Sequence, residues 1–330
     1  MIPQDSLGGT DVSSRANLQN IDFSLLIIRD ENELAKLVNA CEHEGFFYLN
    51  LVGKGSNKMF RDLERLNEIM RDWFAQPLTE KTRMETISNA HGFKPTGVQS
   101  GVLEGSKDGF EVLKIGRQEL RGRWALPPIV LSNLSLFDDF TSTSHFILRA
   151  ILDSLSDGLN LKGGDRFDAH HREDLPSKST LYFLHYPSHS DAQTGEAGQN
   201  MHTDIGSLTL LFAAQWGLQV LSPSSAKWEY VEPRPGHAIV NVADTLRFLS
   251  HRRFRSALHR ALPIDCREDR YSISYFLRAA DNAEFTDSDG TASNARDWCA
   301  TKYGMYEMSH QEQSQSTVLT GGMAQELMKM

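Results

Sequence analysis

The chain has 330 residues, 40% of them hydrophobic and 23% charged, which is ordinary for a soluble globular protein. Its formal net charge of -9 includes no basic excess, so nucleic-acid binding has little electrostatic support. Its three cysteines (Cys41, Cys266 and Cys299) are too widely spaced for a disulfide framework or a thiolate zinc site.

The sequence also argues against a membrane role. No apolar run approaches the roughly 20 residues that span a bilayer, and the N-terminus has no signal-peptide pattern. We therefore expect a cytoplasmic protein with a small-molecule partner and no membrane or nucleic-acid partner. The sequence does not indicate an oligomeric state.

The N-terminal half favours helices. Residues 1–20 are polar and are expected to be a flexible segment, followed by a single domain over 21–330 whose helical part covers 21–178. Asp30 and Glu33 have the spacing of a capping box, which predicts a helix that ends at Gly45. The aromatic run 46–49 predicts a strand, and apolar residues at helical spacing predict helices over 59–74 and 137–159.

The pattern changes over 179–285, the expected core. Short β-branched and aromatic segments alternate there with Gly, Pro and Ser, at 181–186, 208–212, 218–221, 238–242 and 271–276. This pattern is typical of an antiparallel sandwich or barrel, so the whole chain is expected to be α+β. Residues 286–330 are expected to be helical, with a flexible stretch at 308–320 before a short final helix.

One tripeptide has the composition of a metal site. His202 and Asp204 are two residues apart, and in a strand such residues project to the same face. His259 is the candidate third ligand, and two imidazoles with one carboxylate form the set that holds a non-haem Fe(II) with open positions. Taken alone, the tripeptide is also compatible with a loop histidine and a turn aspartate, because the chain has 12 histidines.

A second pair suggests an anchor for an acid. Arg270 and Ser272 lie on one face of a predicted strand, together with Ser274 and Phe276. A buried arginine needs a partner, and a small bidentate carboxylate would satisfy it. A protein Asp or Glu is the alternative partner at this point.

These residues, taken with their neighbours, resemble a known family. Ordered segments across about 20–280 are similar to the 2-oxoglutarate/Fe(II)-dependent dioxygenases of the isopenicillin N synthase-like family. They include 40–49, Leu184-His185-Tyr186-Pro187, His202 through Leu211, Gly217 through Val220, Val240-Asn241-Val242, Phe254 through Arg260, and Arg270-Tyr271-Ser272.

The resemblance implies a double-stranded β-helix, or jelly roll, with flanking N-terminal helices. It implies iron ligation by His202, Asp204 and His259, and binding of the cosubstrate 2-oxoglutarate by Arg270, Ser272 and Tyr186, with O2 as the oxidant. It implies no catalytic side chain beyond the metal centre. The candidate substrate-pocket residues are Phe93, Val112, Lys114, Leu184 and Phe276.

The expected activity is an Fe(II)- and 2-oxoglutarate-dependent oxygenase that hydroxylates, desaturates or cyclises a small organic substrate and releases succinate and CO2. Secondary metabolism is the expected setting. Two alternatives remain open: an isopenicillin N synthase-type oxidase that uses no 2-oxoglutarate, and a non-catalytic jelly-roll binding protein.

Overall fold

The computed structural model describes residues 14–53, 56–84, 86–188, 198–265 and 267–327. Its main element is an eight-stranded sheet in which every pairing is antiparallel except that between the first two strands. The spatial order is β1 (Asn20–Asp22), β2 (Phe46–Asn50), β10 (His237–Val242), β7 (Leu208–Ala213), β12 (Arg270–Leu277), β5 (Thr180–Tyr186), β4 (Glu111–Gly116) and β3 (Gly92–Lys94).

A smaller, four-stranded antiparallel sheet packs on one face of the large sheet. Its order is β6 (Gln199–His202), β11 (His259–Ala261), β8 (Leu218–Leu221) and β9 (Trp228–Tyr230). Phe46, Tyr48 and Ile239 of the large sheet form one apolar cluster with Leu218 and Val220 of the small sheet. The two facing sheets form the jelly-roll core, which confirms the expected α+β class.

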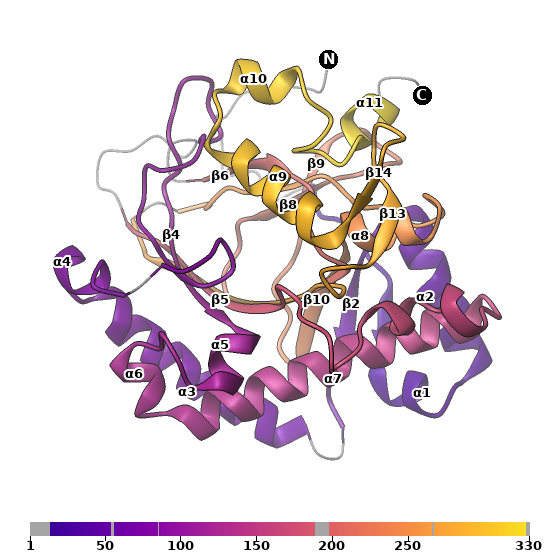
Figure 1. The fold of residues 1–330 in the computed structure, drawn as a ribbon, viewed down its shortest axis with the longest axis horizontal. Helices are drawn as coiled ribbons and strands as arrows, with labels where there is room; N and C mark the ends of the chain where they lie inside the picture. The colour runs from indigo at the N-terminus through magenta and orange to yellow at the C-terminus, as the bar shows by residue number, and fades with distance from the viewer. Residues whose placement is uncertain (1–13, 54–55, 85, 189–197, 266, 328–330) are drawn as a thin grey trace.

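Helices cover the other face of the large sheet. The long helix α7 (Leu134–Gly158) runs along that face (Figure 1). The helices α2 (Glu31–His43) and α3 (Ser56–Phe74) both pack against α7. Phe137 of α7 contacts Phe183, and Phe140 contacts Phe212, so the helix buries its apolar stripe on the sheet. The remaining N-terminal helices are short: α1 (Phe23–Ile27), α4 (Leu78–Lys81), α5 (Arg117–Gly122) and α6 (Pro128–Leu131).

The expected helix after Asp30 forms, with a modified cap. The Asp30 carboxylate accepts from the backbone N–H of Glu33 at 2.9 Å, but the Glu33 carboxylate accepts from Asp22 N–H rather than returning to Asp30. The helix therefore also fixes the end of β1. Gly45 follows the end of the helix as predicted, and its positive φ of +68° suits glycine. A side chain at this position would also collide with the Arg255 carbonyl.

The C-terminal part contacts the side of the jelly roll opposite α7 (Figure 1). After α8 (Asp244–Leu249) and the hairpin of β13 (Glu284–Thr286) and β14 (Ala292–Asn294), helix α9 (Ala295–Glu307) packs Trp298 edge-on against Phe248, with ring centroids 5.0 Å apart. The helices α10 (His310–Ser314) and α11 (Met323–Leu327) follow. Two 3-10 turns, Gly163–Asp165 and Phe167–His170, precede β5.

Two segments that were expected to be flexible include residues with regular contacts. The stretch 308–320 contains α10, whose N-terminus has a complete capping box between Ser309 and Glu312. Within the expected flexible segment 1–20, residues 1–13 lie outside the described residues, whereas Ala16 donates its N–H to the Tyr230 carbonyl and is buried. No helix in the described ranges combines the length and apolar character that crossing a bilayer requires.

Candidate active site

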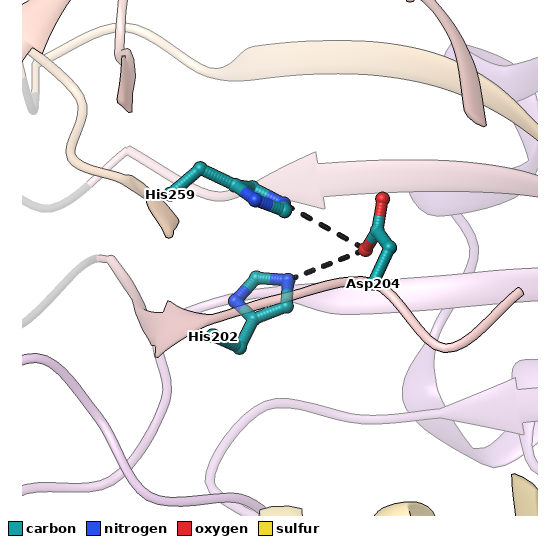
Figure 2. A group of neighbouring side chains, drawn as sticks. All are labelled: His202, Asp204 and His259. Atoms are coloured by element: carbon teal, nitrogen blue, oxygen red, sulfur yellow. Dashed lines mark ion pairs between the residues drawn. The ribbon is translucent and has the colours of Figure 1, made fainter. Parts of the chain in front are cut away.

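His202, Asp204 and His259 converge at the interior end of the small sheet (Figure 2). His202 is the last residue of β6 and pairs directly with His259, the first residue of β11. Each Nε2 lies 3.6 Å from Asp204 Oδ1, and one donor atom from each side chain lies within 4.8 Å of the others. These separations fit donors around one ion, where each bond is about 2 Å.

The local geometry of Asp204 differs from the prediction. Strand β6 ends at His202, so period two does not explain why Asp204 points to the same place. Its position is fixed by contacts instead: Thr209 Oγ1 and Asn241 Nδ2 both donate to Asp204 Oδ2, at 2.6 and 2.8 Å, and Asp244 N–H donates to its carbonyl. The other carboxylate oxygen faces the two histidines.

The hydrogen bonds of the two imidazoles set their tautomers. His202 Nδ1 lies 2.8 Å from the Asn200 carbonyl, and His259 Nδ1 lies 3.1 Å from the Ala257 carbonyl. A carbonyl oxygen can only accept, so each Nδ1 carries the proton and donates. Each Nε2 then offers a lone pair toward Asp204, which is the arrangement found in metal-binding histidines.

The electrostatics also favour ligand forms of these side chains. Burial, reinforced by the neighbouring His259, lowers the pKa of His202 and so favours the neutral ring. Burial alone would raise the pKa of Asp204, but the two imidazoles hold that pKa well below its usual value. A neutral imidazole and an ionised carboxylate are the states that bind a cation.

Arg270, the candidate acid anchor, is a buried arginine at the start of a strand. It begins β12, it is 4% exposed, and no Asp or Glu among the described residues forms an ion pair with it. Its Nε donates to the Trp216 carbonyl at 2.9 Å, and its guanidinium lies 4.9 Å from the ring centroid of Tyr186. Gly217, at φ +134°, makes room for it, because a Cβ there would lie 2.8 Å from Arg270 Nε. Ser272, also buried, follows on the same face.

One cavity joins these groups. It encloses about 930 Å³ between its side chains, part of it open to solvent. Its lining includes the three candidate metal ligands and the three candidate cosubstrate residues Arg270, Ser272 and Tyr186. It also includes four of the five candidate substrate-pocket residues: Val112, Lys114, Leu184 and Phe276.

Phe93 does not line this cavity. It pairs with Leu113, one residue out of phase with Val112 and Lys114, and it packs in the main core with its ring 6.5 Å from that of Trp73. In a strand this phase places its side chain on the other face of the sheet. Its neighbour Lys94 lines the cavity instead.

Several other residues line the cavity that were not among the predicted site residues. Arg278 continues the period-two series from Arg270, and extending that series by one step would have found it. Tyr303 and Tyr306 come from α9, three residues apart and therefore on one helix face. Nothing in the sequence indicates that this face covers the cavity.

Comparison with known proteins gives a consistent result. Residues 178–279 match the family model of the 2OG-Fe(II) oxygenase superfamily. Residues 18–128 match a second family model, whose description is "non-haem dioxygenase in morphine synthesis N-terminal". A 2-oxoglutarate-dependent dioxygenase of Gibberella zeae is 59% identical over 94% of this chain and 94% of its own length. An oxidoreductase of Penicillium aethiopicum is 44% identical over 93% of this chain and 75% of its own.

Solved structures show the same fold. A full-length Neurospora crassa protein in complex with alpha-KG has a TM-score of 0.71 at 20% identity, over 91% of this chain and 99% of that one. A dioxygenase for auxin oxidation from rice has a TM-score of 0.67 at 21% identity, over 89% and 97%.

Proposed function

This chain belongs to the 2OG-Fe(II) oxygenase superfamily and is a 2-oxoglutarate-dependent dioxygenase, and we propose that it hydroxylates a small organic substrate at an Fe(II) held by His202, Asp204 and His259. The observation that carries the proposal is the convergence of these three side chains inside the cavity. Two imidazoles and one carboxylate on a single face leave the remaining iron positions open for other ligands.

The residues present fit the ion. The donor set is the one that suits Fe(II), each Nδ1 donates to a backbone carbonyl and so leaves Nε2 as the ligand atom, and the hydrogen bond from Thr209 holds the Asp204 carboxylate. Fe(II) with 2-oxoglutarate and O2 supplies the oxidation of a substrate C–H bond, with release of succinate and CO2. The side chains of the protein contribute positioning: Thr209 and Asn241 hold Asp204, and the cavity walls hold the substrate and exclude water.

Arg270, Ser272 and Tyr186 are proposed to bind the cosubstrate. The Arg270 guanidinium is buried without a carboxylate partner in the described part of the chain, so a bound carboxylate would satisfy a charge that is otherwise costly. Tyr186 lies against the guanidinium and limits its motion. The distal carboxylate of 2-oxoglutarate fits this position, with the Ser272 hydroxyl as a second donor.

Val112, Lys114, Leu184 and Phe276 are proposed to contact the substrate. Desaturation or ring closure are alternative outcomes at the same site. We also propose a role in secondary metabolism, supported by the fungal origin of the similar dioxygenase and oxidoreductase. A cytoplasmic setting would keep the iron ferrous and agrees with the free, buried thiols of Cys41 and Cys299.

The test is a stoichiometric assay. The purified protein, loaded anaerobically with Fe(II) and 2-oxoglutarate, should bind one iron per chain and develop a visible charge-transfer band. With O2 and substrate it should release one succinate per O2 consumed. O2 uptake without succinate would favour the oxidase alternative, and absence of both iron binding and the band would favour a non-catalytic binding protein. His202→Ala and Asp204→Ala should lose turnover. Without metal, both variants should unfold at the same temperature as the metal-free wild type.

A further inference from the structure

We propose that Lys114 and Arg278, with the Tyr303 hydroxyl, form a second anion subsite in the cavity, and that the substrate carries a carboxylate which this subsite binds. The inference rests on the proposed function, because it assigns the substrate class of the same site.

Arg278 is buried without a counter-ion. It is 5% exposed, and no Asp or Glu of the described residues forms an ion pair with it. Its Nη1 donates to the Lys178 carbonyl at 2.7 Å and its Nη2 to the Tyr303 hydroxyl at 2.9 Å. Its Nε is buried and has no hydrogen-bond partner among those residues. Neutral acceptors alone do not offset a buried guanidinium, so its positive charge remains for an anion bound in the cavity to balance.

Lys114 adds a second cation on the neighbouring wall. It stands on β4 directly across from Tyr182 on β5, and its Nζ lies 5.6 Å from the Tyr182 ring centroid and 5.3 Å from that of Tyr303. Its hydrogen-bond acceptor is a neutral group, the Asn89 carbonyl, at 3.1 Å. Desolvation and the charges of Lys94 and Arg278 lower the pKa of Lys114 to about 7, because each of them disfavours a further positive charge at this position.

Lys94 provides the internal comparison. It lines the same cavity, but its Nζ contacts the fully buried carboxylate of Asp108 and the Phe110 carbonyl. The fold therefore neutralises one cation of this wall and leaves two without an acidic partner. Positive charge that the described protein groups do not match is what an anionic substrate group would complement.

Among the described residues, no acidic side chain takes the place of that anion. Glu307 and Asp281 affect the electrostatics of Lys114 and Arg278 but form no ion pair with either. The hydroxyls of Tyr182 and Tyr303 contact each other, and burial raises the pKa of both, so both phenols stay neutral.

The subsite is distinct from the cosubstrate anchor. Arg270 begins β12 and Arg278 directly follows its last residue, so the two arginines are eight positions apart. Eight positions correspond to roughly 27 Å along an extended strand. One 2-oxoglutarate cannot bind both. Two ring contacts connect the subsite to the metal ligands: Tyr303 lies 6.0 Å from Tyr306, whose ring lies 5.7 Å from that of His202. We infer that the oxidised carbon is separated from the carboxylate by several bonds.

The experiment uses the full-length protein as its anaerobic Fe(II)–2-oxoglutarate complex. The probes are a panel of aliphatic and aromatic monocarboxylic acids, each paired with its primary amide, and binding is measured by calorimetry. At least one acid should bind about tenfold more tightly than its amide. Lys114→Gln and Arg278→Gln should each remove most of that preference, and Arg278→Lys should retain part of it. Lys107→Gln, a change at an exposed lysine, is the charge-matched control and should keep the preference.

The outcomes separate this inference from the function on which it rests. If the charge-transfer band does not form, the proposed function fails. If the band forms and no acid binds more tightly than its amide, the carboxylate subsite is wrong and the oxygenase assignment stands. The wild-type comparison decides the matter even if a variant fails to fold. Equal preference in the wild type and both glutamine variants would also overturn it.

Discussion

Lys302 of α9 contacts the Asp244 carboxylate at a point where both side chains are 0% exposed. The same Nζ donates to Thr203 Oγ1 at 2.6 Å, between the two metal-ligand candidates His202 and Asp204. Ser256 Oγ donates to the other oxygen of Asp244 at 3.0 Å. This buried pair therefore connects the C-terminal helix to the loop that carries the metal site.

Breaking that pair should destabilise the fold. Lys302→Met leaves a buried carboxylate without its counter-ion, which should lower the free energy of unfolding by about 3–5 kcal/mol. The double variant Lys302→Met/Asp244→Leu removes both charges and should recover part of the loss. Urea unfolding of the metal-free chain measures this. Identical midpoints for the wild type and the single variant would contradict the argument.

Asn241 should act on iron affinity through Asp204. Its amide donates to the Asp204 oxygen that faces away from the histidines. Asn241→Leu should therefore weaken Fe(II) binding by about 10- to 100-fold, as loss of supporting hydrogen bonds does at other metal sites. Anaerobic titration with a competing chelator measures the affinity. Asn67→Leu, at a helix position distant in the chain, is the control and should bind iron normally.

Arg270→Ala should raise the 2-oxoglutarate requirement by about 30- to 100-fold, because it removes a charge-assisted bidentate contact. Arg270→Lys should fall between the variant and the wild type, since a lysine keeps the charge but not the forked geometry. Succinate formation against 2-oxoglutarate concentration gives the apparent affinity. An unchanged value in Arg270→Ala would place the cosubstrate elsewhere.

Binding of a carboxylic acid should depend on the protonation of Lys114. Its pKa is lowered to about 7, so the ammonium form dominates below that pH and is lost above it. Affinity for an acid probe should therefore fall as pH rises through about 7. Lys114→Gln should abolish this dependence. Charged or titratable groups on the packed elements are Lys94, Tyr182, Arg278, Cys299, Tyr303 and Glu307.

Calorimetry from about pH 6 to about pH 8 follows this change, with the amide of the same acid as the control. The same slope in the wild type and in Lys114→Gln would assign the titration to another group. Cys299 is an unsuitable source, because burial raises the pKa of its thiol.

The sequence predicted the parts of the site whose chemistry is carried by residue type. The five apolar core segments appear as β5, β7, β8, β10 and β12 with ends shifted by at most one residue. The resemblance of the ordered neighbouring segments, rather than the tripeptide alone, is what singles out His202, Asp204 and His259 in the sequence. The strand argument for Asp204 was nevertheless incorrect, because its orientation comes from Thr209 and Asn241 rather than from β6.

The remainder depends on tertiary packing that no local pattern encodes. Strands β3 and β11 have only three residues, too few to show alternation, and β6 (Gln199–His202) has a single apolar residue. Whether Phe93 or Lys94 faces the cavity depends on how β3 pairs with β4. A shift of that pairing by one residue would exchange the two side chains, and the sequence does not reveal the register. The helical pattern of α9 shows that Tyr303 and Tyr306 share a face, but not what that face covers.

The location of those tyrosines bears on how new specificities could arise. The superfamily match ends at residue 279, and α9, at Ala295–Glu307, lies beyond it. The helix that closes the cavity is thus separate from the strands that carry the iron ligands. We expect that grafting this helix from one relative to another, with Lys302 retained as the attachment point, changes substrate choice and leaves the oxidative chemistry intact.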